Sequence, residues 1–259
     1  MTGKGIIIAV SGKGGVGKTN LAALLVRCLA KIGSVLAIDA DPDSNLPQAL
    51  GAEVKSNVGE IREAIVNAPA RSEVAADKGG AFERELHKIV EETPQCDIVM
   101  MGRSEGEGCY CAINHILRQI IDSRVNMYDF TVIDCEAGLE HLSRRTTKDV
   151  DVMLVVTDAT KNGILTAKRI EQLSKELYVD FGEVLTVGNR VTPETKELLE
   201  EMARENGVKI MAYVPYDPQI AALDIRGRPA LELAADSPAA VAVDGICQQI
   251  LEVAGAVGV

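Results

Sequence analysis

The amino-acid sequence predicts an α/β protein with three layers, in which a mainly parallel sheet has helices on both faces. Short apolar runs rich in β-branched residues alternate with helical patterns along the chain, and a glycine-rich loop directly follows the first run. No internal repeat or low-complexity linker interrupts the series. A chain of 259 residues can form one large core, so we expect a single domain over residues 1–259.

Seven apolar runs are predicted to be strands. They lie at residues 5–10, 35–38, 98–101, 130–133, 152–156, 184–187 and 209–214. Helical patterns lie near residues 21–32, 58–67, 80–92, 112–122, 163–177, 194–206 and 238–254. Because ligands of parallel sheets bind at the carboxyl ends of the strands, the segments that follow the strands are the candidate functional segments.

The loop between the first strand and the first helix has the composition of a phosphate-binding loop. It consists of Gly12, Lys13, Gly14, Gly15, Val16, Gly17, Lys18 and Thr19, and Asn20 follows it. Its backbone N–H groups and the helix end would bind the phosphates of ATP or ADP. Lys18 is expected to contact the β- and γ-phosphates, and the Thr19 hydroxyl is expected to hold Mg²⁺. Lys13 is not needed by its own loop, which suggests a phosphate approached across an interface between two subunits.

These residues resemble the deviant Walker A family of P-loop ATPases. That family includes the nitrogenase iron protein, cell-division and plasmid-partition ATPases, and metallocentre maturation ATPases. The resemblance implies ATP hydrolysis by a homodimer in which Lys13 reaches the nucleotide of the partner. Asn20 departs slightly from the family pattern, because a second threonine commonly follows Thr19.

Acidic residues follow two further strands. Asp39, Asp41 and Asp43 occupy alternate positions after the second strand. In related ATPases the aspartate of the Asp-Pro step, here Asp41, positions the attacking water. Asp39 and Asp43 are candidates for a place near Mg²⁺. Asp134 ends the fourth strand and resembles a Walker B acid, which holds a Mg²⁺-bound water.

Two later segments are candidates for contact with the base. Asn189 follows the run at residues 184–187, and an asparagine can offer one donor and one acceptor to an adenine edge. The family often has an asparagine here, so Asn189 is the predicted adenine contact; a turn asparagine is the alternative. The segment 214–217 also resembles a family segment that passes near the base.

Cys109 and Cys111 form a Cys-x-Cys pair that supplies two soft ligands. A tetrahedral metal site of this kind needs four, which two copies related by a two-fold axis would provide. Two unrelated buried thiols are the alternative. Cys28, Cys96 and Cys247 are interpreted as core residues that stay reduced. A contribution of Cys135, His115 or His141 to a metal site is left open.

The run Gly-Cys-Tyr-Cys-Ala around this pair, together with Asp41-Pro42-Asp43, resembles the nickel-inserting maturation ATPases of the CooC/AcsF group. These serve carbon monoxide dehydrogenase and acetyl-CoA synthase. The resemblance implies a homodimer that binds one Ni²⁺ or Zn²⁺ through four thiolates and supplies a client nickel enzyme. Two alternatives remain: an iron–sulfur reductase like the nitrogenase iron protein, and a positioning ATPase like MinD or ParA.

The formal net charge of −11 disfavours two classes of partner. Nucleic acids and anionic membrane surfaces both attract basic patches, so we expect neither as a partner. No apolar run reaches the roughly 18 residues that span a bilayer. The first strand begins too early to leave room for a signal peptide, so we expect a cytoplasmic protein.

Overall fold

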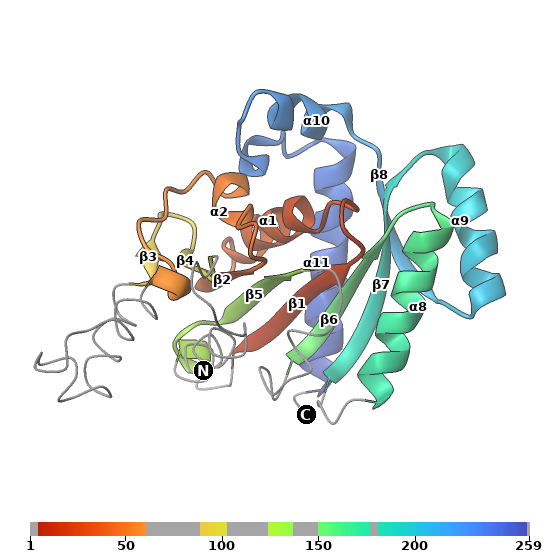
Figure 1. The fold of residues 1–259 in the computed structure, drawn as a ribbon, viewed down its shortest axis with the longest axis horizontal. Helices are drawn as coiled ribbons and strands as arrows, with labels where there is room; N and C mark the ends of the chain where they lie inside the picture. The colour runs from red at the N-terminus through yellow and green to blue at the C-terminus, as the bar shows by residue number, and fades with distance from the viewer. Residues whose placement is uncertain (1–4, 61–88, 103–123, 137–149, 177–180, 258–259) are drawn as a thin grey trace, which may run out of the picture.

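The computed structural model of the chain describes residues 5–60, 89–102, 124–136, 150–176 and 181–257. These residues form three layers, with one β-sheet between two groups of helices (Figure 1). The predicted fold class is therefore confirmed.

The sheet has eight strands. They are β1 (Ile6–Gly12), β2 (Val35–Ala40), β3 (Glu91–Glu92), β4 (Asp97–Met100), β5 (Phe130–Cys135), β6 (Val150–Thr157), β7 (Phe181–Val191) and β8 (Ile210–Pro215). Their spatial order is β3-β4-β2-β5-β1-β6-β7-β8. Every neighbouring pair is parallel except β3 and β4, which are antiparallel. Strand β1 therefore lies inside the sheet, between β5 and β6.

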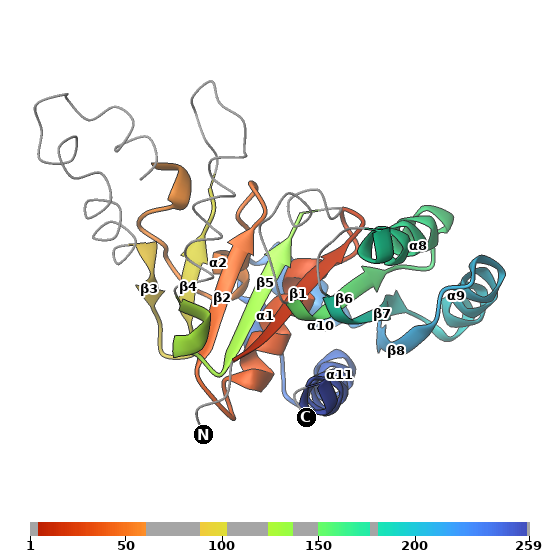
Figure 2. The ribbon, with the colours of Figure 1, turned by 90° about the horizontal axis from the view of Figure 1, so that it is seen from below.

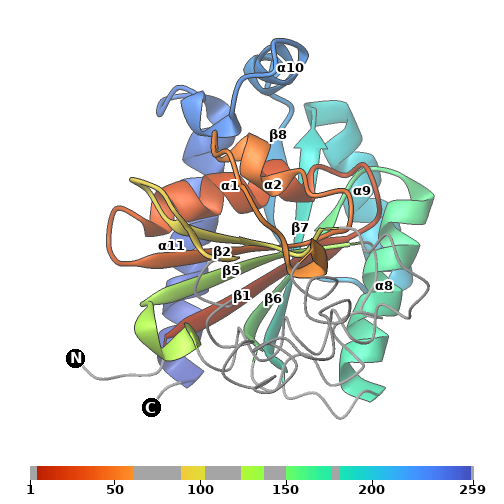
Figure 3. The ribbon, with the colours of Figure 1, turned by 60° about the vertical axis from the view of Figure 1, so that its left-hand side comes forward.

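Helices cover both faces of this sheet. They are α1 (Lys18–Leu29), α2 (Leu46–Ala49), α8 (Lys161–Glu176), α9 (Pro193–Asn206), α10 (Pro218–Ile225) and α11 (Pro238–Val257), with 3₁₀ turns η1 (Val125–Met127) and η2 (Ala230–Glu232). Helices α1 and α11 pack together on one face, and α8 and α9 pack together on the other (Figure 2). The short helices α2 and α10 both lie beside the start of α1 (Figure 3).

Alternating side chains of each strand supply the two cores. In β1, Ile8 and Val10 pack with α1 and α11, while Ile7 and Ala9 pack on the side of α8 and α9. All of these side chains are buried, which is typical of a parallel strand covered on both faces. Full burial of β1 explains why its sequence is a continuous apolar run rather than an alternating one.

The strand register brings the candidate segments together. Val10 of β1 pairs with Asp134 of β5, and Asp39 of β2 pairs with the same Asp134. The carboxyl ends of three neighbouring strands thus meet at one edge of the sheet. The phosphate-binding loop and both acidic segments leave the sheet at this edge, which is where parallel sheets bind ligands.

The structure differs from the expected elements in three places. The prediction of a helix near 80–92 is wrong at its C-terminal end, because Glu91–Glu92 form the short antiparallel strand β3. Helices α2 and α10 were not expected. Strand β7 runs on to Val191, so Asn189 lies within a strand rather than after it. The helix expected near 112–122 falls outside the described residues, as does most of the one near 58–67. Among the described helices, none is long and apolar enough to cross a bilayer.

Candidate nucleotide-binding site

The phosphate-binding loop leaves the start of α1 open to an anion. Gly17 caps the helix in the left-handed region with φ 90°, and no side chain caps the helix or places an acid in its first turn. The N–H groups of a helix start are unsatisfied by the helix itself and carry partial positive charge. Apart from the adjoining residues of the loop, no atom of the described residues lies within 4 Å of the position that a Cβ would take at Gly14 or Gly15. The loop is therefore an open, electropositive cradle.

The two lysines of the loop differ in their surroundings. Lys18 is buried, and its Nζ donates a 3.4 Å hydrogen bond to the carbonyl oxygen of Lys13. This bond keeps the Lys18 ammonium folded against its own loop. The Lys13 side chain is half-buried, and no hydrogen bond or ion pair engages its ammonium within the described part of the chain. Lys13 is thus available to a group outside the described residues.

Thr19 and Asp134 meet beside the loop. Burial raises the pKa of Asp134 to about 6, although the neighbouring Thr19 hydroxyl and the charge of Lys18 both lower it. The Oδ1 atom of Asp134 is fully buried and has no hydrogen-bond partner among the described residues. A buried carboxylate oxygen without a donor is costly. A hydroxyl beside an unsatisfied carboxylate fits Mg²⁺ with its bound waters.

Asp39 organises the loop that carries the other acids. Its Oδ1 accepts a 3.0 Å hydrogen bond from the Asp41 amide and its Oδ2 a 2.9 Å hydrogen bond from the Leu46 amide. Burial raises the pKa of Asp39 to about 7, and the neighbouring Asp134 adds to this effect. Because both oxygens are occupied by backbone donors, Asp39 shapes the loop and starts α2. Asp43 is exposed, and its amide donates to Asp41 Oδ1 at 2.9 Å.

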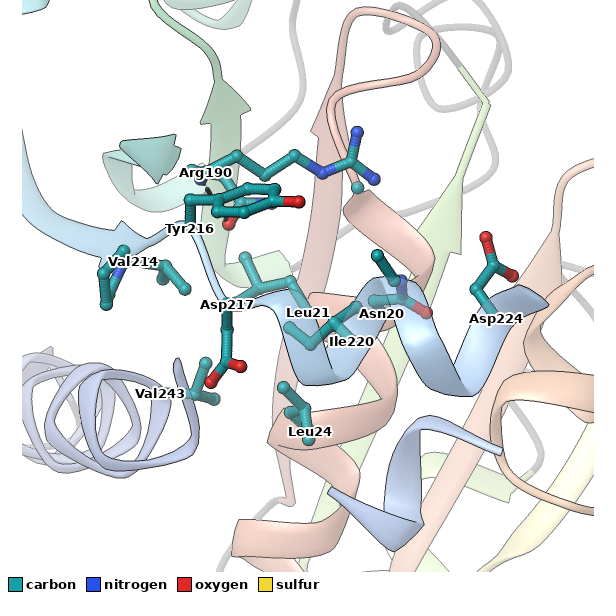
Figure 4. Close-up of a pocket in the computed structure, with 14 residues that line it drawn as sticks. Asn20, Leu21, Leu24, Arg190, Val214, Tyr216, Asp217, Ile220, Asp224 and Val243 are labelled. Atoms are coloured by element: carbon teal, nitrogen blue, oxygen red, sulfur yellow. Dashed lines mark hydrogen bonds between the residues drawn. The ribbon is translucent and has the colours of Figure 1, made fainter. Parts of the chain in front are cut away.

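A pocket of about 270 Å³ adjoins the phosphate-binding loop. Its wall is formed by α1, the end of β7, the turn after β8, α10 and α11 (Figure 4). Its lining residues include Asn20, Leu21, Leu24, Asn189, Arg190, Val214, Pro215, Tyr216, Asp217, Ile220, Asp224 and Val243. The volume is near the lower end for small-molecule sites, which suits one base rather than a whole nucleotide. The structure therefore brings Asn20, Asn189 and the segment 214–217 around one cavity.

Asn189 connects this pocket to the loop. Its Nδ2 donates a 2.7 Å hydrogen bond to the carbonyl oxygen of Val16, and its Oδ1 accepts from the Arg190 amide at 2.9 Å. A Cβ at Gly17 would lie only 2.7 Å from the same Nδ2, so this approach requires glycine. Asp217 in turn accepts from the amides of Gln219 and Ala239, which fixes the starts of α10 and α11.

Arg190 is a site residue that the sequence did not indicate. Its Nη1 donates a 3.0 Å hydrogen bond to the carbonyl oxygen of Gly15, and its backbone has φ 56°. A positive φ is uncommon for a residue with a side chain and marks a position fixed by its surroundings. Arg190 reaches over the pocket on the same side as Tyr216 (Figure 4). Neither the positive φ nor the contact with a loop 175 residues away is readable from sequence.

The residues predicted to bind nickel or zinc are not part of this geometry. Cys109, Cys111, His115 and His141 lie outside the described residues. Cys135 is buried on the α8 and α9 side of the sheet, and burial raises the pKa of its thiol. Asp134, the preceding residue, faces the opposite side. Among the described residues, no group of three or more His, Cys, Asp or Glu side chains could hold a metal ion.

Comparisons with known proteins place this geometry in context. The model of the CobQ/CobB/MinD/ParA nucleotide binding domain matches residues 7–230. Over 95% of the chain, the sequence is 48% identical to the uncharacterized ATP-binding protein MJ0685 of Methanocaldococcus jannaschii, covering 98% of that protein. It is 29% identical to the carbon monoxide dehydrogenase accessory protein CooC of Rhodospirillum rubrum, over 85% of the chain and 87% of the relative. A ParA family ATPase from Chlorobium tepidum superposes with a TM-score of 0.70 at 19% identity, covering 94% of the chain and 98% of that structure.

Proposed function

The chain belongs to the CobQ/CobB/MinD/ParA nucleotide-binding family of P-loop ATPases, and from that premise we propose a specific role within it. It is an ATPase that uses Mg²⁺, acts as a homodimer of single-domain chains, and delivers nickel or zinc to a client enzyme. The client is carbon monoxide dehydrogenase or acetyl-CoA synthase. The observation that carries the nucleotide part is the unsatisfied Asp134 Oδ1 beside Thr19 at an open phosphate-binding loop.

The phosphate end of the site has a group for each task. Mg²⁺ supplies positive charge to the phosphates during phosphoryl transfer. Thr19 would be a ligand of the ion, and Asp134 would accept from one of its waters. Lys18 is already buried beside the loop, so it needs only to exchange the Lys13 carbonyl for a phosphate oxygen. These contacts are the ones a P-loop makes with β- and γ-phosphates.

Asp41 is the proposed water-positioning carboxylate. Its own amide is held by the buried Asp39, and its Oδ1 accepts from the Asp43 amide, which leaves Oδ2 for a water. The segment leaves β2 next to Asp134, because Asp39 and Asp134 are register partners on adjacent strands. A carboxylate fixed in this way can orient a water for in-line attack on the terminal phosphate.

The base is proposed to occupy the pocket beside Asn189. One of the two Nδ2 hydrogens of Asn189 is used on Val16, and the second is left for adenine. Leu21, Leu24 and Val243 supply apolar walls for the ring faces. A base in this pocket would affect the conformation of the phosphate-binding loop, because Asn189 and Arg190 both donate hydrogen bonds to carbonyl oxygens of that loop.

The dimer part of the proposal depends on Lys13 and on the cysteine pair. Lys13 has no partner for its ammonium within the described residues, whereas a phosphate of a second subunit would give it one. Cys109 and Cys111 provide half of a four-thiolate site, which a second copy completes. Similarity to CooC of Rhodospirillum rubrum, named as a carbon monoxide dehydrogenase accessory protein, supports a metal-delivery role. ATP binding and metal binding would then both require the same dimer.

The proposal is tested by titrating the anaerobic protein with Ni²⁺ and Zn²⁺, with and without Mg-ATP. We expect about one metal per dimer, bound tightly through four thiolates. The double variant Cys109→Ala/Cys111→Ala should lose this metal and keep nucleotide binding. The matched control Cys28→Ser/Cys96→Ser removes the same number of thiols elsewhere and should keep both. Unchanged metal affinity in the Cys109→Ala/Cys111→Ala variant would refute the delivery role.

A positioning ATPase is the second candidate, because the matched family model also includes MinD and ParA. It predicts ATP-dependent binding to anionic vesicles or to DNA, which the net charge of −11 opposes. Co-sedimentation with anionic vesicles at physiological salt distinguishes the two. An iron–sulfur reductase would instead show a brown, oxygen-sensitive chromophore in the anaerobic protein.

A further inference from the structure

Cys28 and Cys247 meet where helices α1 and α11 pack together. Cys28 lies in the last turn of α1 and Cys247 in the middle of α11, and each thiol affects the pKa of the other. Both belong to the core on the α1 face of the sheet. Their positions in the sequence indicate two separate core residues, but the fold brings them together as a facing pair.

The packing around the pair fixes its position. Lys31 and Asp244 form an ion pair with an N–O distance of 3.4 Å. Lys31 lies three residues after Cys28, and Asp244 lies three residues before Cys247. Arg27 Nη1 donates a 2.6 Å hydrogen bond to the carbonyl oxygen of Leu233, just before α11. Both contacts join the C-terminal end of α1 to α11 or to the segment that precedes α11, so the two helices are connected next to the thiols.

The two thiols differ in access and acidity. Cys28 is half-buried, whereas Cys247 is 1% exposed. Interaction with the Cys247 thiol, together with the charge of Lys31, lowers the pKa of Cys28 against the opposing effects of burial and Asp244. Interaction with Cys28 and burial raise the pKa of Cys247. The accessible thiol is thus the one favoured as thiolate, which is the nucleophilic form.

We propose that Cys28 and Cys247 are a redox modification site that closes to a reversible disulfide between α1 and α11. The oxidant class is a low-molecular-weight disulfide. The Cys28 thiolate attacks one of its sulfurs, which forms a mixed disulfide and expels one small thiolate. Cys247 then loses its proton and attacks the Cys28 sulfur, and the second small thiol leaves. Two protein thiols and one small disulfide become one protein disulfide and two small thiols.

This disulfide would act on the base pocket. Leu24 and Val243 line that pocket, and each lies four residues, one helical turn, before a member of the pair. The bond would hold the α1 and α11 walls of the pocket at one separation. Formation of this disulfide requires neither metal binding nor a dimer, so its test is independent of the proposed function.

The test is to incubate the full-length protein with glutathione disulfide, block free thiols, and map peptides by mass spectrometry without reduction. We expect a cross-linked peptide pair joining Cys28 to Cys247, lost again with dithiothreitol. Oxidation should also raise the midpoint temperature of unfolding by roughly 5–15 °C, because the bond closes a long loop.

Variants separate this bond from other thiol chemistry. Cys28→Ser and Cys247→Ser should each abolish the cross-linked peptide and the thermal shift, while Cys96→Ser should keep both. The mapping in the unsubstituted protein decides the question even if a core variant folds poorly. Cys28 recovered only as a glutathione adduct, or both thiols recovered free, would overturn the proposal.

Discussion

Asn189 and Val16 are joined by a 2.7 Å hydrogen bond from the side-chain amide of Asn189 to the carbonyl oxygen of Val16. The bond connects the last residues of β7 to the phosphate-binding loop across 173 residues of sequence. It makes the conformation of the loop depend on the strand that forms one wall of the base pocket.

Replacing Asn189 tests this connection. We expect Asn189→Ala to weaken ATP and ADP binding by about 10-fold or more, because the Val16 carbonyl loses its buried donor and adenine loses a contact. Calorimetric titration with Mg-ATP measures the effect. Asn206→Ala is the control, since it removes an amide that bonds within α9 to Met202. Equal affinities of the Asn189→Ala and Asn206→Ala variants would contradict the role of Asn189.

Asp134→Asn tests the magnesium site. The change keeps the shape of the side chain and removes the charge that holds a metal-bound water. We expect ATP hydrolysis to fall by about 100-fold or more, with nucleotide binding in the absence of Mg²⁺ retained. Steady-state phosphate release and binding in EDTA are the two measurements. Asp236→Asn, which alters an exposed acid, should change neither. Full hydrolysis by the Asp134→Asn variant would show that this carboxylate is not used.

Lys13→Ala tests whether the extra lysine acts between subunits. A lysine that reaches the nucleotide of a partner should affect association more than binding within one chain. We expect the variant to bind ATP nearly as well as the unsubstituted protein and to lose ATP-dependent dimer formation. Light scattering with and without Mg-ATP measures the molar mass. Lys161→Ala removes an exposed lysine from α8 and should leave dimer formation intact. A dimeric Lys13→Ala protein in Mg-ATP is the result that would argue against this role.

The buried carboxyls predict how stability changes with pH. Their pKa values are about 7 for Asp39 and about 6 for Asp134, above the ordinary aspartate value of 3.8. The folded state therefore binds these protons more tightly than the unfolded state. Their stabilising contribution is full below about pH 4 and is lost as pH rises through 6 to 7.

Urea unfolding without Mg²⁺ or nucleotide checks this sign. Between pH 4 and pH 8 we expect these two carboxyls to lower the free energy of unfolding by about 6 kcal/mol together. Asp134→Asn should reduce that loss, because one of the two acids is removed and Asp39 no longer faces its charge. If the free energy of unfolding depended on pH identically in the unsubstituted protein and in Asp134→Asn, these carboxyls would not titrate as a buried pair.

The fold was predictable where apolar runs and helical periods are long. All seven expected strands are present, and the central parallel ones are the most clearly marked, because burial on both faces requires continuous apolar runs. Strand β3 was not predicted because it is an edge strand of only two residues. Neither Glu91 nor Glu92 is an apolar or β-branched residue of the kind that indicates a strand. Helix α10 follows a readable signal, Asp217 before Pro218, but its short apolar segment has no buried residue and no clear period.

The sequence could indicate the candidate site only where the chemical groups are close together in sequence. The loop from Gly12 to Thr19, Asp41 and Asp134 are each marked by the strand that precedes them. Arg190 was missed because its backbone conformation and its bond to Gly15 arise from tertiary contacts. The loop-shaping role of Asp39 could not be predicted for a related reason. What distinguishes Asp39 from Asp41 is its burial and its two hydrogen bonds from backbone amides, and both arise only in the folded chain.

We propose that nucleotide and metal bind to one shared dimer, and native mass spectrometry can detect that assembly intact. The anaerobic protein would be loaded with Zn²⁺, Mg²⁺ and a non-hydrolysable ATP analogue, and the intact assembly weighed. We expect a species of two chains that carries two nucleotides and one zinc ion, and we expect the Cys109→Ala/Cys111→Ala variant to lose only the zinc. Zinc bound to single chains, or a nucleotide-loaded dimer without zinc, would contradict it.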